Sequence, residues 1–197
     1  MSEHSGARTG AKLHRRDALL DAAAAMFAER GFNGVSMEEL GAAVGVSGPA
    51  VYRHFSSKQA VLAEILIDVS TALLEGGTRR TRREQDDEAA LHALIAFHVD
   101  FALDNPDVIR VQDRDLHSLA PDEAHTVRSL QRRYVELWVG VLERLTPEVP
   151  TPRLRVRAHA AFGLMNSTPH TLDSRNTLDP GQLRAVLERM AFAALTS

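Results

Sequence analysis

The segment SMEELGAAVGVSGPAVYRHF, residues 36–55, decides how this chain folds, because it predicts two short helices joined by a tight turn. Its first four residues have the S-x-x-E pattern of a capping box, which begins a helix. Gly45 ends that helix, since glycine readily adopts the positive φ of a helix C-terminus. Ser47 is placed to cap the next helix, and Pro49 is tolerated in a first helical turn. This spacing is typical of a helix-turn-helix.

A third helix, predicted over residues 14–30, completes this unit, because helices as short as the two in the segment are not stable alone. Apolar side chains recur along it at the three- and four-residue spacing of a buried helix face. We expect the core between the three helices to contain Leu20, Ala24, Phe27, Leu40, Val46, Val51 and Phe55. Residues 14–60 are therefore predicted to form a three-helix domain.

The second helix of the segment has the composition of a recognition helix, which enters the major groove of DNA. Small residues stand at its start, where they let the backbone approach base edges in a groove about 12 Å wide; they are Gly48, Pro49 and Ala50. Side chains that bind phosphate are expected beside such a helix, and the chain offers Tyr52, Arg53, His54 and Lys58. For Tyr52, packing in the core is the alternative.

The charge distribution agrees with a DNA-binding N-terminal end. The net charge is −3, but residues 1–16 contain four basic residues against one acidic residue, Glu3. Residues 1–13 are predicted to be a disordered basic arm, and the chain beyond residue 60 is acidic. This pattern fits a protein in which only the N-terminal segment contacts the phosphates of DNA. The alternative is that the basic tail is solvated and binds nothing.

The segment and its flanks resemble the N-terminal domain of TetR (tetracycline repressor) family transcriptional regulators. The resemblance covers roughly residues 14–65 without a gap, through Arg30-Gly31-Phe32, Val35-Ser36, Leu40, Gly45-Val46-Ser47, Val51 to Phe55, and Ser57-Lys58 through Leu62. It implies an all-α, nine-helix homodimer with a helix-turn-helix head and a larger ligand-binding body. The resemblance also places several of these positions at or near DNA. Together with the residues chosen above, the candidate DNA-binding residues are Ser36, Ser47, Gly48, Pro49, Ala50, Tyr52, Arg53, His54 and Lys58.

Helical patterns continue to the C-terminus, and no strand is predicted. Six more helices are expected at about residues 57–75, 87–103, 106–119, 121–145, 151–165 and 180–195, with a flexible basic loop over residues 76–83. Residues 61–197 are assigned to ligand binding and dimerisation. The resemblance places the dimer interface at the last two helices, whose small and apolar faces suit a four-helix contact. A two-fold dimer predicts a pseudo-palindromic operator in double-stranded DNA.

A ligand pocket in the body is predicted from two kinds of side chain. Candidate walls are Phe97, Phe101, Tyr134, Trp138, Phe162 and Met165, with His170 at the rim. Two basic ridges at helical spacing, Arg110, Arg114 and His117 and then His125, Arg128 and Arg132, are placed to face each other at the pocket mouth. They would suit a small anionic and apolar effector such as an acyl-coenzyme A or a fatty acid. Surface ridges paired with neighbouring acidic residues are the alternative.

Several classes of protein are set aside by what the sequence lacks. The chain has no cysteine, which excludes a disulfide scaffold, a thiolate zinc site and a cysteine nucleophile. Its nine histidines show no metal-ligand spacing, so neither a metal nor a cofactor is predicted. No apolar run is long enough to span a membrane and no signal peptide begins the chain, which favours the cytoplasm.

The leading hypothesis is a ligand-responsive DNA-binding regulator, in the first place a repressor, and not an enzyme. An all-α enzyme or carrier with an incidental helical hairpin is the first alternative. It would require a catalytic constellation with specific spacing, and the sequence contains none. A regulator controlled by a protein partner is the second alternative.

Overall fold

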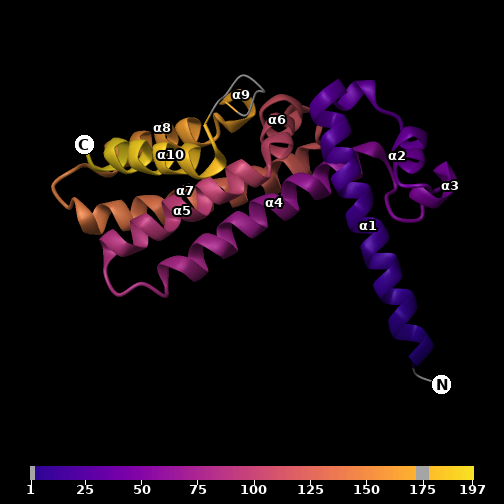
Figure 1. Cartoon of the computed structure of the whole chain (residues 1–197), viewed down its shortest axis with the longest axis horizontal. Coiled ribbons are helices and arrows are strands. Elements are labelled where there is room, and N and C mark those ends of the chain that lie inside the picture. The colour runs from indigo at the N-terminus through magenta and orange to yellow at the C-terminus, as the bar shows by residue number, and fades with distance from the viewer. Residues whose placement is uncertain (1–2, 172–177) are drawn as a thin grey trace.

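The computed structural model describes residues 3–171 and 178–197, with side chains described over residues 15–169 and 178–197. Every regular element in these ranges is a helix, which confirms the predicted all-α class (Figure 1). The α-helices are α1 (Glu3–Arg30), α2 (Met37–Ala43), α3 (Gly48–Val51), α4 (Lys58–Thr81), α5 (Asp87–Asp104), α6 (Pro106–Asp115), α7 (Pro121–Leu145), α8 (Thr151–Met165), α9 (Thr168–Thr171) and α10 (Pro180–Thr196). Short 3-10 turns follow α1 (Phe32–Gly34) and α6 (Leu116–Ser118).

The nine predicted helices are all present in the described residues, and the single turn α9 is an addition. The start of α1 differs from the prediction, because this helix begins at Glu3. Residues 3–13 are therefore helical rather than the disordered arm that we predicted. The physical reason is that extending a helix already formed by residues 14–30 requires no new nucleus.

The second difference is at Gly76 and Gly77, which lie inside α4 rather than in a flexible loop. Glycine disfavours a helix interior by about 1 kcal/mol relative to alanine, which is why the sequence indicated a break. In this structure side chains of α5 and α7 occupy the space that a side chain at Gly76 or Gly77 would fill. A Cβ atom on Gly76 would overlap the Phe97 ring of α5, and one on Gly77 would lie 2.8 Å from Cε2 of Tyr134 on α7. The two glycines let α4 pack closely against both helices.

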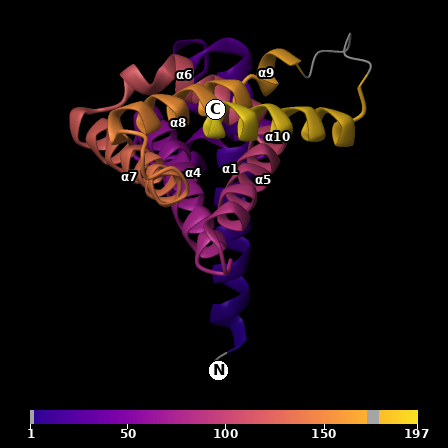
Figure 2. The same cartoon turned by 90° about the vertical axis from the view of Figure 1, so that its left-hand side faces the viewer.

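The molecule has a head, α1 to α3, at one end and a body, α4 to α10, at the other, and α4 runs from the head into the body (Figure 1). In the body α4 packs against α5 and α7, while α8 and α10 lie side by side across them (Figure 2). α6 packs against α1 and so connects the body to the head. The first turns of α1 extend away from all the other helices (Figures 1 and 2).

Buried apolar side chains form one cluster in the head and another in the body. All seven residues predicted for the head core belong to the first cluster, with Leu20 and Val46 at its edge. This cluster also contains Val111 of α6 and Val127 of α7. The head is therefore not packed separately from the body, although the sequence suggested a boundary near residue 60.

Candidate DNA interface and effector cavity

The capping box at the start of α2 holds the Ser36 hydroxyl inside the head. Ser36 Oγ accepts a hydrogen bond from the Glu39 backbone N–H at 3.2 Å and donates to the Glu39 carboxylate at 2.7 Å. The bonds from the Ser36 side chain and backbone, and one from Arg30, lower the pKa of Glu39 to about 2. The Ser36 hydroxyl proton is thus used within the protein, in the capping role that the sequence predicts, and the contact of Ser36 with DNA stays a prediction.

Gly41 sets the distance between α2 and α3. A Cβ atom at this position would lie 2.8 Å from the Val46 carbonyl oxygen and 2.9 Å from Val51 Cγ2. Gly45 has the positive φ expected of it, 70°. Because both glycines permit a tight turn, α3 is held at a fixed angle on the head, as a recognition helix requires.

The start of α3 and the turn after it form the exposed surface of the head. Ser47, Pro49, Tyr52 and Arg53 are exposed, and Gly48, Ala50 and His54 are half-buried, whereas Val51 and Phe55 are buried. Tyr52 keeps 51% of its surface exposed, which excludes the alternative that it packs in the core. α3 itself ends at Val51, so the residues that follow lie in turns rather than in the longer helix that we predicted.

Ser47 occupies the N-cap position of α3, as predicted, but its side chain makes no capping hydrogen bond. Ser47 is exposed at the start of α3, where Pro49 has no N–H and the N–H groups of Ala50 and Val51 already donate to the Ser47 carbonyl oxygen. The Ser47 hydroxyl is therefore the side-chain donor that this end of α3 offers to a phosphate oxygen.

Lys58 has a structural role that the sequence did not reveal. Its ammonium donates to the carbonyl oxygens of Phe32 and Val35, each at 2.7 Å, and lies 4.4 Å from the centroid of the Phe32 ring. These contacts fix the turn between α1 and α2. An ammonium has three N–H donors, so only one remains for the phosphate contact that we predicted.

Arg114, a predicted pocket residue, instead joins the body to the head. Its guanidinium, on α6, donates to the carbonyl oxygens of Phe27 and Ala28 in the last turns of α1. It also forms an ion pair at 3.0 Å with Asp115, whose side chain is only 6% exposed. A cation at a helix C-terminus is favourable because the carbonyl groups there carry partial negative charge. The Arg114 contact therefore ties α6 to α1.

We expect Arg114→Gln to lower the free energy of unfolding by about 1–2 kcal/mol, because it leaves the Asp115 carboxylate buried without its cation. Arg133→Gln is the matched control, since Arg133 is an exposed arginine on α7 and its loss should cost less than about 0.5 kcal/mol. Urea unfolding followed by circular dichroism measures both. Equal stabilities of the two variants would show that the contact contributes nothing.

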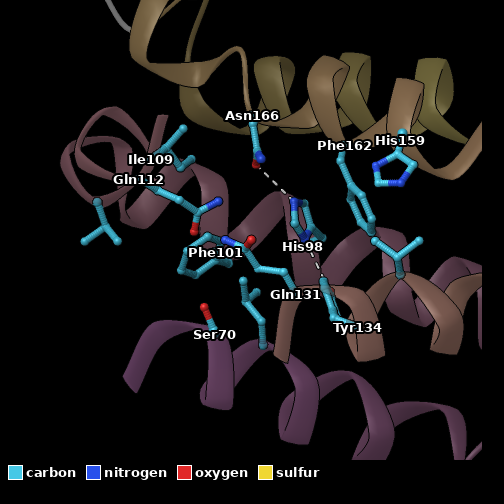
Figure 3. A pocket seen from close by; sticks show the side chains of 13 residues that line it. Ser70, His98, Phe101, Ile109, Gln112, Gln131, Tyr134, His159, Phe162 and Asn166 are labelled. Carbon is cyan, nitrogen blue, oxygen red and sulfur yellow. Dashed lines mark hydrogen bonds between the residues drawn. The ribbon is translucent and has the colours of Figure 1, made fainter. Parts of the chain in front are cut away.

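The body contains a cavity of about 210 Å³ between α4, α5, α6, α7 and α8 (Figure 3). Gln112 and Gln131 reach into it from α6 and α7 (Figure 3). Its walls combine aromatic and aliphatic side chains with uncharged polar ones: Ser70, Leu73, His98, Phe101, Val108, Ile109, Gln112, Gln131, Tyr134, Val135, His159, Phe162 and Asn166. Such a mixture suits a small organic ligand that is mostly apolar and makes a few hydrogen bonds.

His98 is the central polar group of the cavity wall. Its Nε2 lies 3.0 Å from Asn166 Oδ1 and its Nδ1 lies 3.3 Å from the Tyr134 hydroxyl (Figure 3). Since the Asn166 oxygen can only accept, Nε2 carries the proton and Nδ1 accepts from Tyr134. Burial lowers the pKa of His98 to about 4 and raises the pKa of Tyr134. Both groups are therefore uncharged at neutral pH.

The aromatic residues predicted as pocket walls have different positions. Phe101, Tyr134 and Phe162 line the cavity. Trp138 and Met165 are fully buried in the body core, and Phe97 packs over Gly76 with the Arg80 guanidinium 4.0 Å from its ring centroid. For these three the prediction of a cavity wall is wrong, because the apolar pattern alone does not separate a wall from a core. The side chain of His170 lies outside the described residues.

The two basic ridges do not face each other across this cavity. Arg110 pairs with Asp107 at 3.2 Å and donates to the Pro169 carbonyl at 2.7 Å, and Arg114 contacts α1. His117 lies in the 3-10 turn after α6 and does not line the cavity. Arg128 and Arg132 line a neighbouring surface cleft instead. The ridges diverge because helical spacing fixes the face of each helix but not how α6 turns relative to α7.

Sequence reasoning missed most of the polar cavity wall, including His98, Gln112, Gln131 and His159. One signal was available for His98, which interrupts the apolar run Leu94-Ile95-Ala96-Phe97 to Val99 of the helix predicted over residues 87–103. The others have no pattern of their own. Among the residues described, no group of three or more histidine and acidic side chains is placed to hold a metal ion. Searched over the same residues, the chain has no helix both long and apolar enough to cross a membrane.

Comparison with known proteins gives this arrangement a family. The model described as bacterial regulatory proteins of the tetR family matches residues 19–65, and that of the tetracyclin repressor-like C-terminal domain matches residues 84–195. The chain belongs to the TetR family of transcriptional regulators. Proteins of this family are transcriptional regulators and not enzymes. The family assignment therefore excludes the alternative of an all-α enzyme or carrier.

Individual relatives agree with this assignment. The TetR-family chain is 33% identical over 137 residues to the HTH-type transcriptional repressor KstR2 of Rhodococcus jostii (strain RHA1). The aligned region covers 68% of this chain and 67% of KstR2. The crystal structure of the TetR-family regulator PfmR from Thermus thermophilus matches with a TM-score of 0.77 and 23% identity, over 91% of this chain and 95% of that one. AibR, crystallised with isovaleryl coenzyme A and operator DNA, matches with a TM-score of 0.76 and 18% identity, over 89% of this chain and 97% of the AibR chain.

Proposed function

We propose that this TetR-family regulator represses transcription by binding a pseudo-palindromic operator as a homodimer, and that a small molecule in the body cavity releases it. The observation that carries the DNA-binding part is the division of residues around α3. Tyr52 and Arg53 are exposed together with Ser47 and Pro49, while Val51 and Phe55 in the same segment are buried. Side chains on this surface are free to contact phosphate and bases. Because its target is chromosomal DNA, the protein acts in the cytoplasm.

Dimerisation is supported by the outward faces of α8 and α10. Val156 on α8 is 67% exposed and Met190 on α10 is 51% exposed. Ala160 and Gly163 on α8 and Ala193 on α10 are also exposed, so the face is small and apolar. A second copy of the chain can pack its own α8 and α10 here to form a four-helix contact, which gives the two heads the two-fold symmetry of a palindrome.

An effector in the cavity has two routes to the head. α4 contributes Ser70 and Leu73 to the cavity wall and begins at Lys58 in the head. α6 contributes Ile109 and Gln112 to the wall and is tied to α1 through Arg114. A ligand that prefers one position of these helices changes the spacing of the two heads. Moving the population from 1:99 to 99:1 requires a preference of about 5.5 kcal/mol.

The test is footprinting of genomic fragments with the purified protein, followed by affinity measurements at several salt concentrations. We expect a two-fold symmetric footprint and a dimer by sedimentation. Arg53→Gln removes one phosphate contact per protomer, so the slope of log K against log salt should become shallower by about 2 per dimer. Arg133→Gln, an exposed arginine in the body, is the control that should leave the slope unchanged.

Two outcomes would contradict the proposal. The absence of any sequence-selective footprint would exclude an operator-binding function. A slope that changes equally for Arg53→Gln and Arg133→Gln would show that the surface around α3 is not the part that meets phosphate.

A further inference from the structure

A groove lies between α1 and α4, where the head meets the body (Figure 1). Its volume is about 350 Å³. On each helix the wall residues are spaced by three, four and seven positions, from Asp17 to Ala24 on α1 and from Ile65 to Ala72 on α4, so one face of each helix lines the groove. Val108 of α6 completes the wall and also lines the effector cavity, which is a separate space.

The floor of the groove is apolar and only partly covered. Leu20, Val69 and Val108 line it and are half-buried, and Ala72 is exposed. Methylene groups that replaced water on this floor would gain about 25 cal/mol for each Å² of apolar surface buried. The floor therefore suits an aliphatic chain.

Three carboxylates stand along the groove. Asp17 and Asp21 of α1 and Asp68 of α4 line it, and all three residues are exposed. Among the residues that the structure describes, they form no ion pair with one another's neighbours, and no lysine or arginine is part of the groove wall. Arg16, which precedes Asp17 in the chain, is paired with Glu64 instead. The groove thus keeps a net negative charge.

Glu64 shows the effect of this charge on a neighbouring group. Burial raises the pKa of Glu64, the Arg16 guanidinium opposes the rise, and the Asp68 and Asp17 carboxylates add to it. Neighbouring negative charges raise the pKa of a carboxyl because they disfavour its ionised form. The same potential attracts a cation to the groove.

The spacing of the carboxylates indicates which kind of cation fits. Within the described residues, no group of three or more histidine and acidic side chains is placed to hold one metal ion. Asp17 and Asp21 are four residues apart on a helix, which puts their Cβ atoms about 5–6 Å apart. Two ammonium groups joined by a few methylenes match this spacing, and Asp68 on α4 is placed for a further ammonium.

We propose that the groove binds an aliphatic polyamine, whose ammonium groups pair with Asp17, Asp21 and Asp68 while its methylenes cover the apolar floor. A compact multivalent cation would leave the floor exposed, and a bulky monovalent cation would leave carboxylates unpaired. Because α1 belongs to the head and α4 runs from the head into the body, a bound polyamine connects the two. The groove is separate from the effector cavity, so polyamine binding does not depend on what the cavity holds.

Isothermal titration calorimetry of the full chain, at low ionic strength and without DNA, measures this binding. Spermidine is the probe, with three ammonium groups on an aliphatic chain. Cobalt(III) hexaammine has the same charge and no methylene groups, and n-butylamine has methylenes and a single ammonium group. We expect spermidine to bind at least about fivefold more tightly than either, since it alone uses both the carboxylates and the floor.

The double variant D17N/D68N removes one carboxylate from each helix and should bind spermidine at least about fivefold more weakly. The matched control is E29Q/D104N, which removes the same charge from exposed positions outside the groove and should bind as the unchanged protein does. All four residues are on the surface, so thermal melting should show that both variants are folded.

Binding of cobalt(III) hexaammine or n-butylamine as tightly as spermidine would overturn the proposal, because charge alone or a single ammonium would then explain the affinity. Equal weakening in D17N/D68N and E29Q/D104N would overturn it as well, since binding would follow the net charge of the protein. Absence of saturable spermidine binding would refute the polyamine site. None of these results bears on the operator footprint, which is measured separately and tests the proposed function.

Discussion

Replacing His98 by glutamine is expected to remove a large part of the loss of stability that the protein suffers on acidification. His98 is fully buried among aromatic rings, and burial lowers its pKa from 6.5 to about 4 in the folded state. Between these two values the unfolded chain binds a proton that the folded protein does not. The free energy of unfolding therefore falls as pH falls, by about 1.4 kcal/mol per pH unit and roughly 3 kcal/mol in all.

Glutamine has no charge at any of these pH values, so it removes this contribution while keeping hydrogen-bonding groups near Tyr134 and Asn166. The measurement is urea unfolding, followed by far-ultraviolet circular dichroism, at steps between pH 7 and pH 4. The stability difference between the unchanged protein and the variant should shrink as pH falls. His125→Gln, an exposed histidine on α7, is the control that should retain the full dependence on pH. Parallel curves for the unchanged protein and His98→Gln would refute a buried neutral imidazole.

Gly77→Ala should destabilise the protein, although alanine is the better residue for a helix by about 1 kcal/mol. The added methyl would lie 2.8 Å from Tyr134 Cε2, 3.1 Å from Leu137 Cδ2 and 3.2 Å from Leu94 Cδ2. Tyr134 cannot move aside easily, because it is buried and stacked against Phe162 at a centroid distance of 5.6 Å. Overpacking of this kind costs about 1–3 kcal/mol, so it outweighs the gain in helix propensity.

Gly140→Ala is the matched control, because Gly140 lies inside α7 and the nearest atom to an added Cβ is Arg144 Nη1 at 3.8 Å. This variant should be more stable by up to about 1 kcal/mol. Thermal melting distinguishes the two, since 1 kcal/mol shifts the Tm of a chain of this size by roughly 2–4 °C. A rise in Tm for Gly77→Ala would show that α4, α5 and α7 are not packed as closely as described.

Much of the head follows from the sequence, because local signals fix it. The capping box at Ser36, the turn at Gly45 and the N-cap at Ser47 are found at the predicted residues. α7 and α8 also begin and end as predicted, since proline and the apolar period fix them. Lys58 shows the limit of such signals. Its two carbonyl partners are 23 and 26 residues away in sequence, and no local pattern indicates that they meet its ammonium.

The sequence by itself determined the all-α class and the helix-turn-helix, because turn chemistry, capping and apolar spacing act over only a few residues. The resemblance of residues 14–65 to known regulators indicated the TetR family. The tertiary structure alone decided which polar side chains line the cavity, that Arg114 contacts α1, and that α4 passes unbroken through Gly76 and Gly77. These features depend on how helices distant in sequence rotate and approach one another. The rotation and approach of these helices are determined by the packing of whole helix faces, which a short stretch of sequence does not reveal.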